Sequence, residues 1–533
     1  LVTGPITFQV DPGTYTEQIS IPSNIIGSSA INTITFDGGN GNAATRILTF
    51  ATGASASSIS HVLRFNNCSN VIFRNMTIRS SGVSEAWTVH FMNGTNNRLN
   101  NCVVDMTGNG TTSGSTNFVS VLINGSNTSQ GTASTIANNH RIDSCTINFG
   151  NNGIFSNINN GNNTNYFVNN NFVNAYFNGF YAQNPQTVKF INNIITMRSS
   201  ITSHIPLYLV SCNPIGSNFH EIAGNRILTT GQMGIYLNSS QGSGTGKGMV
   251  YNNFVNGNVY NSPTYGINLA SSSNWNIYHN TVNHDIIPVS PNSVCLYIQN
   301  GSNNEVQNNM LSISRLSGNV SYPLMINPAS AASIVNNNNY YNAASNVLVQ
   351  IGGLNYTSSN FKASYPSGGG LNSLNNNPSY VSTSNIHITN PCNNGANLGI
   401  TTDIDGNPRG SMPDIGADEM TSVPNNDLGA FLINSPSFPF VIGNQNITVT
   451  LKNYGGNNIT SANINYQVNG GSVTTYAWTG NLASCDTVSV VLPTPHNFVA
   501  GTSNIKVFTN SPNGASDVAP ANDTVQVTLC PAL

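Results

Sequence analysis

Acid–base chemistry needs carboxyl groups that lie close together, and the middle of this chain contains few of them. Between residues 61 and 350 the acidic residues are Glu85, Asp105, Asp143, Glu221, Asp285 and Glu305. Glycoside hydrolysis needs two facing carboxyl groups, whereas elimination needs acids that hold Ca²⁺ beside a basic residue. No two of these acids are adjacent, so the sequence favours a noncatalytic protein without excluding an enzyme.

Two weaker catalytic candidates remain in this region. His284 is followed directly by Asp285, which could form an acid–base pair or a plain loop or corner contact. Asp105 and Asp143 would approach each other only if the chain folds into stacked repeats, in which residues about one repeat apart become neighbours. Both candidates therefore depend on the architecture.

Acidic residues are denser further along the chain. The cluster consists of Asp403, Asp405, Asp414, Asp418 and Glu419. One interpretation is a structural Ca²⁺ site, because hard cations collect carboxylate oxygens from loops. The other is a polar closing segment in which Arg409 neutralises part of the charge, and this alternative predicts no cofactor. We expect the segment to close the end of the repeats.

Aromatic residues offer a further candidate site. They recur at Tyr176, Phe177, Phe180, Tyr181, Tyr208, Tyr236, Tyr251, Tyr260, Tyr265, Trp275 and Tyr278. Many of these side chains would belong to a core, whereas those that point outward could contact sugars. This pattern predicts a carbohydrate-binding surface as an alternative to simple packing.

The elements that must position these residues are predicted by a degenerate unit of six residues, apolar-x-x-Asn-x-apolar. It recurs about ten times between Phe73 and Tyr340, for example as Phe190-Ile-Asn-Asn-Ile-Ile195 and Val306-Gln-Asn-Asn-Met-Leu311. The spacing suits one coil of a parallel β-helix, in which the apolar positions point inward and the middle turns a corner. The chain is therefore predicted to be a solenoid.

The fourth position of the unit is predicted to form a ladder of stacked amides. Its occupants are Asn171, Asn193, Asn225, Asn253, Asn280, Asn309 and Asn338, preceded by Met76, Cys102 and Cys145 in the early coils. Met and Cys at this position indicate burial. Asparagine tolerates the left-handed backbone of a tight corner and can bond to an equivalent amide in the next coil.

The predicted organisation is all-β, with a right-handed parallel β-helix over residues 1–420 and an immunoglobulin-like β-sandwich over residues 427–533. Residues 1–60 would form the first coils, and residues 351–420 a loop-rich closing region. Short alternating segments such as Ile447-Thr-Val-Thr-Leu451 and Ile505-Lys-Val-Phe508, separated by Gly and Asn turns, support the sandwich.

Several motifs carry a family resemblance. The opening Gly13-Thr-Tyr-Thr-Glu-Gln-Ile19, the Asn-rich coils and the closing Asp414-Ile-Gly-Ala-Asp-Glu419 resemble secreted right-handed parallel β-helix proteins of Bacteroidota type. The C-terminal part resembles the CARDB-type immunoglobulin-like domains that follow such solenoids. This resemblance implies an extracellular or cell-surface protein, exported through outer-membrane machinery such as type IX secretion.

Cysteine usage separates the two regions. Cys68, Cys102, Cys145, Cys212 and Cys295 fall in coil-like segments, and we expect them to be buried and unpaired. Cys485 and Cys530 lie in the sandwich region, where a disulfide between them is one alternative.

Composition narrows the class of partner. Charged residues make up 6% of the chain, the net charge is -3, and basic residues form no cluster. We therefore expect neither nucleic-acid binding nor membrane insertion. The sequence favours a noncatalytic surface or filament module for adhesion or matrix building. Its partner would be a polysaccharide, a neighbouring surface protein or another copy, and the enzyme alternative is a polysaccharide lyase or glycosidase.

Overall fold

A computed structural model describes residues 1–53, 60–82, 84–108, 115–228, 231–257, 264–285, 293–315, 321–363, 370–421, 423–517 and 519–530. The chain divides into two compact units. The first comprises Leu1–His387 and Gly395–Glu419, and the second comprises Ile388–Asn394 and Met420–Leu533. Tyr260, one of the aromatic candidates, lies outside the described residues.

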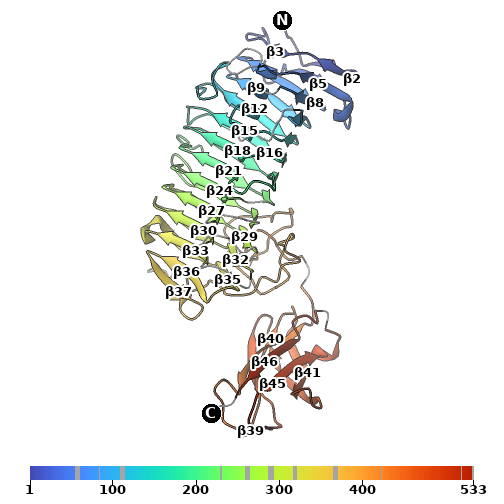
Figure 1. Cartoon of the computed structure of the whole chain (residues 1–533), viewed down its shortest axis with the longest axis vertical. Coiled ribbons are helices and arrows are strands. Elements are labelled where there is room, and N and C mark those ends of the chain that lie inside the picture. Colours follow the sequence, from blue (N-terminus) through green and yellow to red (C-terminus); the bar gives the residue numbers. More distant parts are fainter. Residues whose placement is uncertain are drawn as a thin grey trace. The chain divides into compact units, whose positions relative to one another are not determined.

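The first unit is a parallel β-solenoid of three sheets, and Figure 1 shows the strands of one of them stacked along the solenoid. Sheet A contains β1 (Ile6–Gln9), β4 (Ile34–Asp37), β7 (Val71–Arg74), β10 (Arg98–Asn100), β13 (Arg141–Asp143), β16 (Thr164–Val168), β19 (Thr187–Ile191), β22 (Glu221–Ala223), β25 (Gly248–Tyr251), β28 (Trp275–Tyr278), β31 (Asn304–Gln307) and β34 (Ala332–Asn336). Sheet B contains β2 (Gly13–Thr16), β5 (Arg46–Phe50), β8 (Thr77–Ser80), β11 (Val103–Asp105), β14 (Thr146–Asn148), β17 (Asn171–Val173), β20 (Ile194–Thr196), β23 (Arg226–Ile227), β26 (Phe254–Gly257), β29 (Thr281–His284), β32 (Met310–Ile313) and β35 (Asn339–Asn342). Sheet C contains β3 (Ile19–Ile21), β6 (His61–Asn66), β9 (Ala86–Met92), β12 (Phe118–Asn124), β15 (Asn152–Asn157), β18 (Asn178–Gln183), β21 (Ile205–Val210), β24 (Met233–Asn238), β27 (Thr264–Ala270), β30 (Ser293–Gln299), β33 (Ser321–Asn327), β36 (Val347–Ile351) and β37 (Leu354–Thr357).

The corner between sheets A and B explains the repeated asparagines. The residue before each ladder position has a left-handed backbone, with φ between 51° and 65°, at Asn75, Asn101, Ser144, Asn169, Asn192, Gly224, Asn252, His279, Asn308 and Asn337. Asparagine and glycine adopt this conformation at little cost, which favours them here. The next residue then turns its side chain into the core, and from Asn170 onward this side chain is an amide.

These inward amides form a continuous ladder from Asn170 to Asn338. Each Nδ2 donates to the Oδ1 of the next member at 2.9 to 3.0 Å, through Asn193, Asn225, Asn253, Asn280 and Asn309. Each of these Oδ1 atoms also accepts the preceding ladder residue's backbone N–H, as at Asn193 and Asn280. The predicted inward ladder is therefore present, and it ends where Asn338 N donates to Ser373 Oγ.

One member of the ladder was predicted in the wrong register. Asn171 is exposed, whereas Asn170 is buried and occupies the ladder. The cause is the adjacent apolar pair Phe167 and Val168, because β16 aligns Phe167 with the inward Phe190 of β19. The unit therefore begins at Phe167, and its fourth residue is Asn170.

The solenoid ends in an antiparallel hairpin. Strand β37 pairs with β36, and the 3₁₀ helix η3 (Phe361–Ala363) places Phe361 against the buried Tyr340. The other 3₁₀ helices are η1 (Ala43–Thr45), η2 (Ala329–Ala331) and η4 (Pro512–Gly514). Among the described residues, no helix is long and apolar enough to span a bilayer.

The acidic segment does not close the last coil, so this prediction was wrong. The chain instead returns over the outside of sheet B, beside β29 and β32 in Figure 1. Tyr380 Oη lies 2.7 Å from Ser312 Oγ of β32, Asn256 of β26 donates to Thr383 O, and Arg226 of β23 contacts Asp405. We call residues 373–387 and 395–419 the return segment.

The second unit is an antiparallel β-sandwich. Its sheets are β38 (Leu428–Ser435), β40 (Thr448–Asn453) and β43 (Thr487–Val491); β39 (Gly443–Gln445) and β44 (His496–Phe498); and β42 (Thr474–Leu482), β41 (Ile459–Val468), β45 (Ser503–Asn510) and β46 (Thr524–Leu529). The fold class predicted from the sequence, a parallel β-solenoid followed by a β-sandwich, is thus confirmed.

The cysteines follow the prediction in the solenoid but not in the sandwich. Cys68, Cys102, Cys145, Cys212 and Cys295 are buried and free. Cys485 bonds to Cys392, and Cys530 is exposed and free. The Cys485–Cys530 alternative was therefore wrong, because residues 388–394 join the sandwich and bring in a cysteine from outside the predicted domain.

Candidate functional site

The predicted pair His284 and Asp285 does not form an accessible acid–base site. His284 is enclosed in the solenoid, where a Cβ added at Gly266 would lie 3.2 Å from its Nε2. Burial, aided by the charge of Arg315, lowers the pKa of His284 to about 3, while burial raises the pKa of Asp285. A neutral imidazole that faces the core has no route to a surface substrate.

Asp105 and Asp143 do not converge either. Strand pairing aligns Asp105 with Asn148 in sheet B and Asp143 with Asn100 in sheet A. Arginines neutralise both: Arg79 lies 2.8 Å from Asp105, and Arg98 lies 2.7 Å from Asp143. Arg141 is a second partner of Asp143, at 3.3 Å.

The outer face of sheet A carries two glutamates that the sequence analysis did not single out. Glu221 contacts Lys189 at 3.4 Å and accepts from Tyr251 Oη at 2.8 Å. Glu305 contacts Lys247 at 2.6 Å and accepts from Tyr278 Oη. Burial, reinforced by these carboxylates, raises both tyrosine pKa values.

Glu221 and Glu305 are too far apart to act as a glycosidase pair. Strands β22 and β31 are separated by three steps in sheet A, which corresponds to roughly 14 Å between strands. The two carboxyl groups of glycosidases lie about 5 to 9.5 Å apart. His220 precedes Glu221 directly but is fully buried, and its Nδ1 accepts from Val188 N inside the solenoid, so it cannot complete a pair there.

The return segment gathers the predicted metal ligands, but most are matched by donors of the protein. Asp403 Oδ1 accepts two backbone N–H groups at 2.8 Å, and its Oδ2 accepts from Glu419 N. Glu419 pairs with Arg409 at 2.8 Å and also accepts from Asp414 N. Burial lowers the pKa of Arg409, and the surrounding carboxylates oppose that shift.

Asp405 and Asp418 lie beside a histidine. Ligand atoms of His387, Asp405 and Asp418 lie within 4.8 Å of one another. Asp405 is already paired on both oxygens, with Arg226 at 2.5 Å and His387 at 2.8 Å. Protein groups thus already occupy both oxygens of Asp405, and a Ca²⁺ ion in this segment remains a prediction.

The sandwich holds a separate group of acids, Asp427, Asp517 and Asp523. Burial raises the pKa of Asp427 to about 6, opposed by a hydrogen bond from Asn522 and reinforced by Asp517. Burial and then the charges of Asp517 and Asp427 raise the pKa of Asp523 to about 7. Because both values exceed the unfolded value of 3.8, these acids cost the sandwich stability as pH rises from about 4 to about 7.

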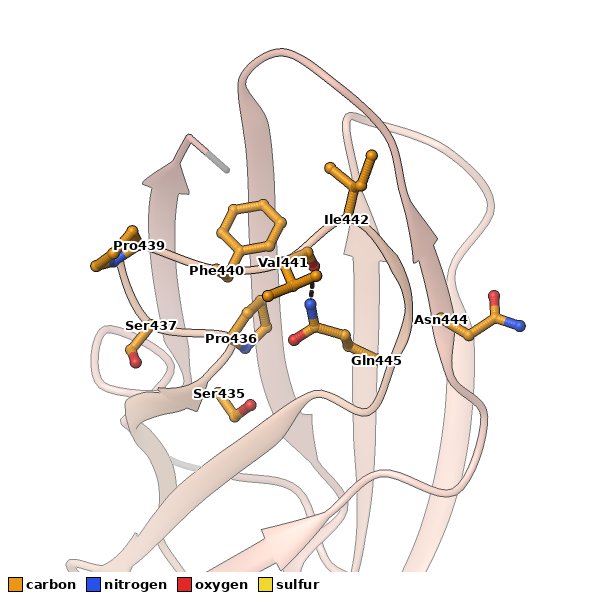
Figure 2. Close-up of a pocket in the computed structure, with 9 residues that line it drawn as sticks. All are labelled: Ser435, Pro436, Ser437, Pro439, Phe440, Val441, Ile442, Asn444 and Gln445. Atoms are coloured by element: carbon orange, nitrogen blue, oxygen red, sulfur yellow. Dashed lines mark hydrogen bonds between the residues drawn. The ribbon is translucent and has the colours of Figure 1, made fainter. Parts of the chain in front are cut away.

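A hollow of about 490 Å³ also lies in the sandwich. It is lined by Ser435, Pro436, Ser437, Pro439, Phe440, Val441, Ile442, Asn444 and Gln445. Figure 2 shows the Gln445 side chain donating a hydrogen bond from its amide to the Val441 carbonyl. The lining contains no titratable group, so it offers a contact surface and no acid–base chemistry.

The outer face of sheet C gathers several of the predicted aromatic residues. Strand alternation buries Leu207 and Leu209 and turns Tyr208 outward. Register then aligns Phe155, Tyr181, Tyr208, Tyr236, Asn268 and Tyr297 along the solenoid. We call this line of outward residues the tyrosine row. Ring centroids of Tyr181 and Tyr208 lie 5.2 Å apart, and those of Tyr208 and Tyr236 lie 4.7 Å apart.

Amides flank the tyrosine row. Tyr181 Oη donates to Gln183 Oε1 at 2.9 Å, and Asn238 Nδ2 donates to Tyr208 Oη at 3.3 Å. Strands β15, β18, β21, β24, β27, β30 and β33 contain no Asp, Glu, Lys or Arg. Burial raises the pKa of Tyr181 to about 12 and also raises that of Tyr236, so these phenols are neutral donors and acceptors.

The other aromatic candidates lie elsewhere. Phe180 and Trp275 are buried in the core, and Tyr251 and Tyr278 belong to sheet A. Tyr265 is on sheet C, 5.4 Å from Tyr297 between ring centroids. Tyr176 and Phe177 follow β17, where Arg198 lies 5.4 Å from the Tyr176 ring. The sequence analysis missed Tyr297, although the alternation Leu296-Tyr-Ile298 places it outward.

Comparison with known proteins finds likeness at the level of the fold. No protein-family model matches the chain, and no curated protein is recognisably similar to it in sequence. Among solved structures, tailspike protein 3 of bacteriophage CBA120 matches with a TM-score of 0.39 and 10% identity, over 65% of this chain and 54% of the tailspike. A double mutant of the periplasmic alginate epimerase matches with a TM-score of 0.39 and 12% identity, over 65% and 82%. This chain thus spans about half the length of the tailspike.

Proposed function

We propose that this protein is a noncatalytic extracellular surface module that binds glycans through the outer face of sheet C. The observation that carries the proposal is the tyrosine row, which is flanked by amides and free of charged residues over seven strands. Phenol and amide groups can exchange hydrogen bonds with sugar hydroxyls, and the ring edges offer apolar contact.

One further observation supports an exported protein. The Cys392–Cys485 disulfide is typical of oxidising compartments. In this proposal the protein belongs with the Bacteroidota-type β-helix proteins that carry a CARDB-like sandwich and leave the cell through type IX secretion.

The binding test compares wild type with Tyr208→Ala and Tyr236→Ala on a broad panel of polysaccharides, by affinity electrophoresis. Each substitution should weaken binding about tenfold, which corresponds to about 1.4 kcal/mol. Tyr166→Ala is the matched control, because Tyr166 is a half-buried outward tyrosine on sheet A. Binding that survives both sheet C substitutions, or falls equally in the control, would contradict the proposal.

The proposal that the protein is noncatalytic has a separate test. Incubation of the protein with the same panel, with and without Ca²⁺, should release neither reducing ends nor unsaturated products. Among the described residues, the outward carboxylates of sheet A are paired with basic side chains and no facing pair occurs. Product formation that is lost in Glu221→Gln or Glu305→Gln would establish the lyase or glycosidase alternative instead.

A further inference from the structure

Three acidic residues of the sandwich converge beside the first strand of this unit. Asp427 directly precedes β38, Asp523 directly precedes β46, and Asp517 lies in the loop between β45 and β46. One carboxylate oxygen from each residue lies within 4.8 Å of the other two. Because Asp427 is far from the other two in the sequence, only the folded sandwich assembles the group.

No basic side chain balances this group among the residues that the structure describes. None of the three acids takes part in an ion pair, whereas Glu305 of the solenoid has Lys247 at 2.6 Å. Burial, followed by the charges of Asp517 and Asp427, raises the pKa of Asp523 to about 7. Like charges held together away from water are costly, and a bound cation removes that cost.

Unpaired oxygens give a second, independent indication of a ligand. Asp523 Oδ1 and Asn522 Oδ1 are both buried, and within the described part of the chain no donor reaches either of them. Asn522 lies beside the acids, because its Nδ2 donates to Asp427 Oδ1 at 2.9 Å, and Asp427 is only 3% exposed. Most buried acceptors in native proteins have a partner, and a bound ion is one way to supply it.

The backbone of the sandwich holds the acids in place. Asp517 accepts from Leu428 N through Oδ2 at 3.0 Å and from Ala519 N through Oδ1 at 2.9 Å. The Asp523 carbonyl accepts from Thr509 N of β45 at 3.1 Å. A carboxylate oxygen has two lone pairs, so these hydrogen bonds leave each one able to bind a cation. The positions of the ligands are thus fixed before the ion arrives, which favours binding.

The donor atoms and their spacing select the cation. The group offers oxygen ligands only, and these suit hard cations. Ca²⁺ binds oxygens at about 2.3 to 2.6 Å, so opposite ligands lie up to about 4.6 to 5.2 Å apart. Mg²⁺ binds at about 2.0 to 2.1 Å and needs a tighter, near-octahedral arrangement. Separations of up to 4.8 Å therefore suit Ca²⁺ without rearrangement.

We propose that the sandwich binds one Ca²⁺ ion through carboxylate oxygens of Asp427, Asp517 and Asp523, with Asn522 Oδ1 and water completing the coordination. The ion joins the start of β38 to the loop between β45 and β46 and thereby stabilises the sandwich. Calcium sites of extracellular modules have dissociation constants of about 0.1 to 1 mM. This inference does not depend on glycan binding by the solenoid.

The test follows Ca²⁺ binding to the full chain in metal-free buffer at pH 8, by calorimetric titration and by the thermal midpoint of the sandwich. In wild type the midpoint should rise with Ca²⁺ concentration, with half-saturation at about 0.1 to 1 mM. Asp523→Asn should weaken Ca²⁺ binding about tenfold or more, because it removes a ligand charge. Without Ca²⁺ this variant should be at least as stable as wild type, because it also removes a repulsive charge. Its loss of binding would therefore not reflect unfolding.

Asp486→Asn is the matched control. Asp486 is an exposed acid of the same unit, and its backbone carbonyl keeps the hydrogen bond from Asn453 N. This variant should respond to Ca²⁺ as wild type does, and Mg²⁺ should act on wild type at least about tenfold more weakly than Ca²⁺.

Four results would overturn the inference. They are a wild-type midpoint that does not rise with Ca²⁺, an unchanged affinity in Asp523→Asn, an equal response to Mg²⁺, and a response that is lost in Asp405→Asn. The last result would place the ion in the return segment, where Asp405 lies.

Discussion

The adjacent residues Asn170 and Asn171 provide a stringent test of the amide ladder. Asn170 Nδ2 donates to Ile142 O at 2.7 Å and to Asn193 Oδ1 at 3.0 Å, and its Oδ1 accepts from Cys145 N at 2.9 Å. In Asn170→Ala, Asn193 Oδ1 keeps the backbone N–H of residue 170, but Ile142 O and Cys145 N lose their side-chain partner. Each of these two buried groups costs about 1 to 3 kcal/mol when it is left unpaired. The free energy of unfolding should therefore fall by about 2 to 6 kcal/mol.

Asn171→Ala is the control for this prediction. The Asn171 side chain is exposed, and the hydrogen bond from Asn171 N to Cys145 O survives the substitution. This substitution should change the free energy of unfolding by no more than about 0.5 kcal/mol. Denaturant unfolding followed by the fluorescence of the two solenoid tryptophans, Trp87 and Trp275, measures both variants. Equal destabilisation, or a larger loss for Asn171→Ala, would refute the register and the ladder argument.

Three other perturbations have defined outcomes. Asn280→Asp buries a carboxyl in the ladder, so the free energy of unfolding should fall by several kcal/mol at pH 8 and by less at pH 4, where the acid is protonated; a pH-independent loss would contradict this. Asp523→Asn should stabilise the sandwich by about 1 to 2 kcal/mol at pH 8, allowing for screening, and have little effect near pH 4; calorimetry at both values would expose the opposite trend. Cys392→Ser should destabilise the sandwich by about 2 to 4 kcal/mol in chemical denaturation, while Cys530→Ser should have no effect; equal behaviour would argue against the disulfide.

The solenoid could be predicted from the sequence because its local rules repeat. A left-handed corner selects asparagine or glycine, and the residue after it must either bond to its counterpart or be apolar, as at Asn193 and Cys102. The register failed where the apolar pair Phe167 and Val168 precedes a run of three asparagines, Asn169 to Asn171. The local pattern cannot show whether the unit begins at Phe167 or at Val168. The pairing of β16 with β19 determines this.

The candidate site was harder to predict from the sequence than the solenoid. Alternation within a strand identifies Tyr208 and Tyr236 as outward, but which neighbours align depends on loop lengths that differ from coil to coil. The return segment and the Cys392–Cys485 bond join residues far apart in the sequence, and no short-range pattern encodes such contacts. The pairing of Lys247 with Glu305, 58 residues apart, is similar.

The most direct measurement is an experimental structure of the full chain with a bound oligosaccharide of a polysaccharide that binds on the panel. The account predicts sugar density along the outer face of sheet C, in contact with Tyr208 and Tyr236. Density on sheet A beside Glu221 and Glu305, or in the hollow of the sandwich, with sheet C empty, would contradict it.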